Sequence, residues 1–144
     1  MSIIPQGQLN RLRASISWSN YPALNVTAPY LSKRGLSLNF GGDATTYVDT
    51  MTGAVSSPEP YLKATITAHI NKALFLAQSY KAQMELMSYL GGCTVRPDVN
   101  SMQPWRFYDC SIQGVDGLDF SGAEADYPVR IGGYYYINSA LYNN

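Results

Sequence analysis

The fold is decided by residues 61–92, which read YLKATITAHINKALFLAQSYKAQMELMSYLGG. In the first third of this stretch, apolar residues occupy every second position from Leu62 to Ile70. This period of two, rich in β-branched residues, predicts a strand with one apolar face. The opposite, polar face of that strand is expected to carry Lys63, Thr65, Thr67 and His69.

The remainder of the same stretch changes its period. Apolar residues recur every three or four positions from Leu76 to Leu90, which predicts an α-helix over 72–91 with one apolar stripe. Asn71 suits the N-cap, and Gly91-Gly92 suits the left-handed stop at the C-terminus. A single helix with one apolar stripe must cover a sheet, which the rest of the chain has to supply.

The other segments read as strands separated by turns. Alternation predicts a first strand at 11–18, with Leu12, Ile16 and Trp18 facing inward. Further strands are predicted at 24–27, 36–40, 93–96, 105–115, 118–121, 127–131 and 134–137. Pro128 indicates a sheet edge or a bulge at that point. The expected fold class is mainly β with one α-helix: an antiparallel β-sandwich or partly closed barrel of about eight strands, flanked by the helix.

With 144 residues, the chain is expected to form a single domain over 1–144. Residues 1–9 read as an irregular arm and 139–144 as a polar tail. Residues 41–60 are predicted to form a long projecting hairpin or loop with its tip at 49–54. Loops of this length are uncommon unless they have a role, and this one would expose Tyr47, Val48, Met51 and Val55.

The charge content is unusual. Charged residues make up 14% of the chain, against roughly 25% in ordinary domains, whereas Tyr occurs 12 times. Interfaces between subunits are depleted in Lys and Glu and enriched in Tyr, so this composition favours burial against other subunits. A β-rich domain with tyrosines on its faces is the simpler alternative.

The few charges are also unevenly distributed, although the net charge is zero. The first 40 residues contain bases and no acid, and most of the charges near the C-terminus are acidic. We expect contacts between unlike charges on neighbouring subunits, from head-to-tail association. The residues concerned are Arg11, Arg13, Lys33, Arg34, Asp116, Asp119, Glu124 and Asp126.

Catalytic and metal-binding patterns are not found. His69 is the sole histidine; a general base is conceivable, but a surface or interface position is the simpler expectation. The nucleophile elbow, the Walker loop and the zinc-protease motif are absent. Cys93 and Cys110 lack metal-ligand spacing and are expected to be buried, reduced thiols. We therefore predict no enzyme, no cofactor, no signal peptide and no membrane-spanning segment.

The order of elements resembles that of the tail tube proteins of contractile-tailed bacteriophages, an architecture shared with type VI secretion tubes. The resemblance lies in the basic first strand, the long loop between two strands and the central helix ending at Gly-Gly. It also includes the segments PYLKATITAHI (60–70) and DYPVRIGGYYYIN (126–138).

This resemblance implies a structural subunit of the virion tail that assembles in the host cytoplasm. Such subunits form hexameric rings that stack into a hollow conduit for DNA delivery. The implied partners are identical copies, the surrounding tail sheath protein, the tape measure protein and, transiently, double-stranded DNA in the lumen. No membrane binding by the chain is expected.

In the same picture, Tyr47, Val48, Asp49, Met51 and Val55 would form the inter-ring stacking loop. The lumen would be lined by the face of Lys63, Thr65, Thr67 and His69. The face around Asp109, Ser111 and Gln113 competes for that role. Two alternatives remain open: a terminator or baseplate initiator ring at one end of the tail, and a monomeric β-sandwich binding module that uses the Tyr-rich surface.

Overall fold

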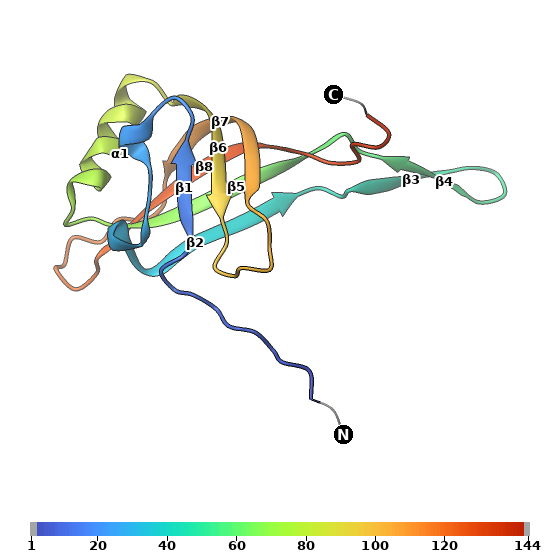
Figure 1. Ribbon diagram of the computed structural model, residues 1–144. Helices are drawn as coiled ribbons and strands as arrows, with labels where there is room; N and C mark the ends of the chain where they lie inside the picture. The colour runs from blue at the N-terminus through green and yellow to red at the C-terminus, as the bar shows by residue number, and fades with distance from the viewer. Residues whose placement is uncertain (1–2, 143–144) are drawn as a thin grey trace.

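The computed structural model describes residues 3–142, which form a curled antiparallel sheet, one α-helix and a projecting hairpin (Figure 1). The strands are Ser15–Trp18 (β1), Leu31–Gly41 (β2), Thr45–Asp49 (β3), Ala54–Pro58 (β4), Tyr61–Asn71 (β5), Tyr89–Arg96 (β6), Trp105–Val115 (β7) and Asp126–Tyr136 (β8). The helix is Phe75–Leu86 (α1), and 3-10 turns span Pro22–Leu24 and Ala28–Tyr30. The predicted fold class, mainly β with one helix, is confirmed.

Six of the strands form one sheet in the order β1-β6-β7-β8-β5-β2, curled into a half-barrel. Strands β3 and β4 pair only with each other. The neighbouring strands β5 and β8, both inside the sheet, run antiparallel in unbroken register from Tyr61↔Tyr136 to Asn71↔Asp126. Their apolar side chains point into the core, as the pairs Ile66↔Ile131 and Ala68↔Val129 illustrate.

The helix is joined to the core by a buried tyrosine. The Tyr80 hydroxyl accepts a hydrogen bond from the Trp18 indole N–H at 3.0 Å and donates one to the Leu24 carbonyl at 2.6 Å. Burial raises the pKa of Tyr80, so the phenol stays protonated and keeps its donor. Helix α1 is thereby linked to β1 and to the turn at Pro22–Leu24.

The predicted helix ends were wrong. Helix α1 begins at Phe75 instead of 72, with Leu74 instead of Asn71 at its N-cap, and it ends at Leu86 instead of 91. Leu90, Gly91 and Gly92 belong to β6. Gly91 does have a positive φ, +87°, but it lies at an irregularity of the β6–β7 pairing, where it faces Cys110. Because Leu90 is fully buried in the sheet, packing overrode the helical period.

The first strand was also predicted too long. Residues 11–13 form a turn, and Leu12 is 77% exposed instead of facing the core. Ile16 and Trp18 are buried as predicted. The strand expected at 24–27 reduces to a single bridge between Ile16 and Val26.

Near the C-terminus, the two strands predicted at 127–131 and 134–137 are one continuous strand, β8. The glycines between them do not bend the chain; they allow close approach of β7. A Cβ at Gly133 would lie 2.7 Å from the Cys110 Sγ atom, and one at Gly132 would collide with Gln113. The strand predicted at 118–121 is absent from the described structure, in which this segment lies in the β7–β8 loop.

The edge or bulge predicted at Pro128 is found locally: β8 lies inside the sheet, but the last β7 residue that pairs with it, Val115, stands opposite Val129. The Pro128 carbonyl accepts the Asp116 N–H at 3.1 Å. Within a strand, the nitrogen and carbonyl of one residue point toward the same neighbour, so the Pro128 nitrogen faces the point where β7 ends at Val115. The missing donor therefore interrupts no ladder inside the sheet.

We predict that Tyr80→Phe lowers the free energy of unfolding by about 2 kcal/mol, because the Trp18 N–H and the Leu24 carbonyl lose their shared partner inside the core. Urea unfolding followed by tryptophan fluorescence measures the change. Tyr61→Phe is the control, since Tyr61 is half exposed and packs edge-on against Tyr134 through its ring alone. Equal stability of Tyr80→Phe and the wild type would contradict the role given to the hydroxyl.

Candidate functional site

The β3–β4 hairpin is one of the highly exposed parts of the described structure. It extends from the end of the sheet, with no second layer drawn over either face (Figure 1). Val48 pairs with Val55 across the hairpin, Tyr47 is 71% exposed and Met51 at the tip is fully exposed. The predicted projecting hairpin is confirmed, with its tip within 49–54. A two-stranded hairpin is marginally stable alone in water, so these residues are suited to cover another surface.

The base of the hairpin, in contrast, is anchored to the C-terminal segment. The Asn138 side chain donates to the Glu59 carbonyl at 2.7 Å, and the Tyr142 hydroxyl donates to the Pro58 carbonyl at the same distance. The Glu59 N–H is bonded to the Ala44 carbonyl at 2.9 Å. The hairpin therefore projects in a defined direction from the sheet.

Two further surfaces lack a partner within the part of the chain that is described. Strand β2 pairs only with β5, which leaves one edge of its 11 residues open. Residues 3–9 lie apart from the sheet with Ile3, Ile4 and Leu9 exposed, as the predicted arm requires (Figure 1). Open sheet edges are sites where another chain can add a strand.

The two polar faces that were predicted as alternative lumen linings meet in one surface. Lys63 and Thr65 of β5 line a shallow hollow of about 480 Å³ together with Asp109, Ser111 and Gln113 of β7. They meet across β8, where Thr65 pairs with Gly132 and Ser111 pairs with the same glycine. Because Gly132 has no side chain, the polar groups of β5 and β7 approach each other over the middle of β8.

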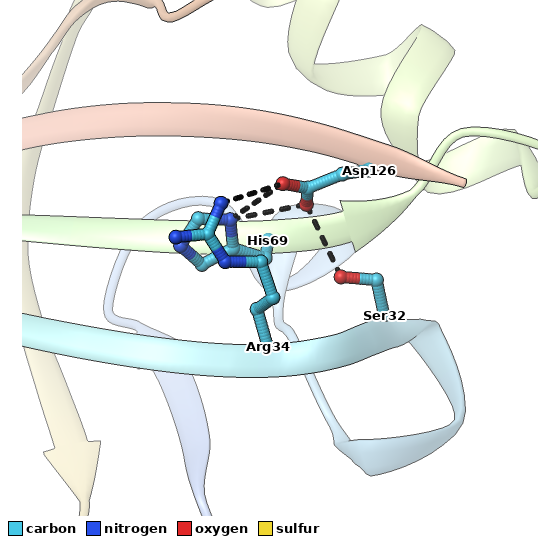
Figure 2. Close-up of polar contacts among 4 residues, drawn as sticks. All are labelled: Ser32, Arg34, His69 and Asp126. Carbon is cyan, nitrogen blue, oxygen red and sulfur yellow. Dashed lines mark hydrogen bonds and ion pairs between the residues drawn. The ribbon is translucent and has the colours of Figure 1, made fainter. Parts of the chain in front are cut away.

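His69 lies on the same strand but not on this open surface. Its Nδ1 atom lies 2.9 and 3.0 Å from the two carboxylate oxygens of Asp126, and the two residues are only 8% and 7% exposed (Figure 2). The same carboxylate accepts a hydrogen bond from Ser32 at 3.1 Å and lies 3.8 Å from Arg34. The expected exposed position of His69 is therefore corrected. Asp126, which was expected to contact a neighbouring subunit, has its partners within its own chain.

This cluster of Ser32, Arg34, His69 and Asp126 does not have the geometry of a catalytic triad. Ser32 and His69 both bind the carboxylate, whereas a triad requires the hydroxyl to bind the imidazole. The cluster instead joins three adjacent strands, β2, β5 and β8 (Figure 2). Ser32 and Arg34 reach it because β2 is irregular here: five steps from Leu31 to Leu36 oppose two from Ile70 to Ala68.

The other residues expected to make inter-subunit charge contacts fall into two groups. Some have partners within the same chain. Asp116 pairs with Arg130 at 3.0 Å, and the Arg13 guanidinium donates to the carbonyls of Pro97 and Val99. The Asp119 carboxylate accepts the Ser121 N–H at 3.0 Å, which lowers the pKa of Asp119. Arg11, Lys33 and Glu124 are exposed and make no ion pair within the described residues.

Cys93 and Cys110 are both buried and unbonded, in agreement with the prediction. Their Sγ atoms lie 3.6 Å apart on the adjacent strands β6 and β7. Within residues 3–142, no group of three or more His, Cys, Asp or Glu side chains is arranged to hold a metal ion. None of the helices described there is long and apolar enough to cross a membrane.

Comparison with known proteins finds no protein-family model that matches this chain and no curated protein that matches it. The functional argument therefore depends on the surfaces themselves. Sequence reasoning found the hairpin and both halves of the polar face, but it missed the open edge of β2 along its full length. It also missed the His69–Asp126 pair, whose partners are 57 positions apart and give no local signal.

We predict that Asp126→Asn destabilises the fold by about 2 kcal/mol, because the amide offers one buried acceptor oxygen instead of two to the donors of β2 and β5. Urea unfolding of the variant measures the loss. Asp116→Asn is the matched control: its ion pair with Arg130 is half exposed, so a change within about 0.5 kcal/mol is expected. If the two variants lose the same stability, the cluster has no special structural role.

Proposed function

We propose that this chain is the structural subunit of a phage-type tail tube, in which stacked rings form a hollow conduit for DNA. The observation that carries the proposal is the anchored, uncovered β3–β4 hairpin, with Tyr47, Val48, Met51 and Val55 exposed to solvent. Residues of this kind, held on a fixed projection, are suited to contact a second copy in the next ring.

Lateral contacts within a ring are supported by the sheet edges. Strand β2 is open along one side, and β1 at the other end of the sheet has only four residues and a single bridge to Val26. When the open edge of one copy adds to the opposite edge of the next, the contact is heterologous, and such contacts close into a ring if the rotation allows. The low charge content favours burial of this surface between subunits.

The polar face is suited to a lumen. The hollow on it is lined by one base, Lys63, and one acid, Asp109, together with Thr, Ser and Gln side chains. Strong DNA binding needs several Lys or Arg side chains that neutralise phosphates. A hollow with one base and one acid, beside an Arg130 that is paired with Asp116, would let double-stranded DNA pass without being held. The tail sheath protein would surround the tube, and the tape measure protein would occupy the lumen before DNA does.

One observation favours the alternative of a binding module. Four half-exposed tyrosines stand at the hairpin end of the polar face: Tyr61 packs against Tyr134 with ring centroids 5.1 Å apart, and Tyr108 against Tyr136 at 4.9 Å. Aromatic surfaces of this kind can stack on sugars or bases. A chain with that function would remain a monomer at high concentration. A ring that forms but never stacks would favour a tail terminator or a baseplate initiator.

We predict that the wild-type chain forms rings and tubes at high concentration, visible by negative-stain microscopy. Replacing 49–54 with Asn-Gly should leave closed rings and abolish tubes, because the two-residue turn still joins Val48 to Val55 but removes the tip. Circular dichroism checks that the sheet is retained. Tubes of normal length from this variant would refute the stacking role, and a wild-type monomer at every concentration would refute the tube itself.

A further inference from the structure

A groove at the other end of the molecule has no role in the surfaces described above. It lies between α1 and the β7–β8 loop, and its volume is about 490 Å³. The apolar part of its lining consists of Ala77, Met84, Val115, Leu118, Phe120 and Tyr127. Tyr127 forms a buried floor, whereas Phe120 is largely exposed. An apolar groove with an exposed aromatic wall is suited to receive another apolar side chain.

The groove and the hairpin lie at opposite ends of the long β5–β8 ladder. The hairpin leads into β5 at Tyr61, which pairs with Tyr136, whereas α1 follows the other end of β5, where Asn71 pairs with Asp126. Figure 1 shows the hairpin and the helix at the two extremes of the molecule. A projection at one end and a recess at the other generate head-to-tail stacking, with each copy contacting the next by the same pair of surfaces.

The charges of the two surfaces are complementary. The hairpin segment 41–60 contains Asp43, Asp49 and Glu59 and no base. The groove is lined by two lysines and one acid: Lys72 lies over the Phe120 ring at 5.5 Å, and Lys81 pairs with Glu85 at 2.9 Å.

The adjacent β7–β8 loop contributes further acids, Asp116, Asp119 and Glu124. Asp116 is held by Arg130, whereas the pKa of Asp119 is lowered by the hydrogen bond from the Ser121 N–H and also by the nearby charge of Lys72. Glu124 is not part of the groove lining. The Lys72 ammonium group donates to the Asp119 backbone carbonyl, which carries no net charge. Among the side chains that line the groove itself, two are basic and one is acidic.

We infer that the groove between α1 and the β7–β8 loop receives the tip of the β3–β4 hairpin from the next copy of the chain. Met51 enters the apolar groove beside Leu118 and Phe120, and Asp49 lies near the lysines of the rim. This inference rests on the proposed tube function and adds the receiving surface to it. The exposed N-terminal arm, with Ile3, Ile4 and Leu9, is the competing occupant, but it contains no acid to match the lysines.

A cross-linking experiment distinguishes the two occupants. Met51→Cys and Leu118→Cys are combined in one chain, assembled and treated with a short bismaleimide; Cys93 and Cys110 are buried and serve as the unreactive background. We expect a ladder of covalently linked copies on denaturing gels. Each single variant is a control and should give no ladder. A ladder from Ile4→Cys with Leu118→Cys, or no ladder from the Met51 pair in assembled tubes, would overturn the inference.

Charge reversal tests the same contact without cross-linking. Asp49→Lys and Lys81→Glu should each raise the concentration needed for stacking by about threefold to tenfold, and the double variant should recover part of that loss. Asp43→Lys, an exposed acid near the hairpin base, is the matched control. Tubes that tolerate both single changes refute the groove contact but not the tube. If the wild type forms neither rings nor tubes, the proposed function itself fails, and the groove contact fails with it.

Discussion

The unbroken ladder between β5 and β8 is the constraint on which the rest of this structure depends. Its eleven paired positions, from Tyr61↔Tyr136 to Asn71↔Asp126, place every second side chain in the core and the others on the polar face. At about 3.3 Å per residue the ladder is on the order of 35 Å long, so it also separates the hairpin at one end from the helix at the other. A shift of one residue would exchange the two faces and expose the core.

Two local features shape how the neighbouring strands β7 and β2 pack on this ladder. On one side, Gly132 and Gly133 leave room for the Gln113 and Cys110 side chains of β7, which a Cβ at either glycine would meet. On the other side, β2 departs from regular pairing and brings Ser32 and Arg34 over the buried His69–Asp126 pair (Figure 2). Close packing between β7 and β8, and the Asp126 carboxylate shared by β2, β5 and β8, hold these four strands together. The outer edge of β2 remains open.

The surfaces without a partner follow from this arrangement. Many of the exposed apolar side chains lie where segments leave the sheet, in the hairpin, the arm and the groove beside α1, and others lie at the two ends of α1. Their exposed apolar groups are unfavourable in water and become favourable when copies meet. We interpret the subunit as a piece whose remaining contacts are completed by identical copies, which is the physical basis of the proposed tube.

The sequence alone was sufficient wherever one strand's alternation decides the structure. It predicted strands at 62–70 and 105–115, which the structure has as Tyr61–Asn71 and Trp105–Val115, the hairpin between 41 and 60, and the fold class. It failed where a long-range contact competes with a local pattern: Leu90 continues the helical stripe but is buried in β6, and His69 lies among threonines but is paired with Asp126. Periodicity reports which face of an element is apolar; only the packed structure decides what covers that face, because the covering residues come from distant parts of the chain.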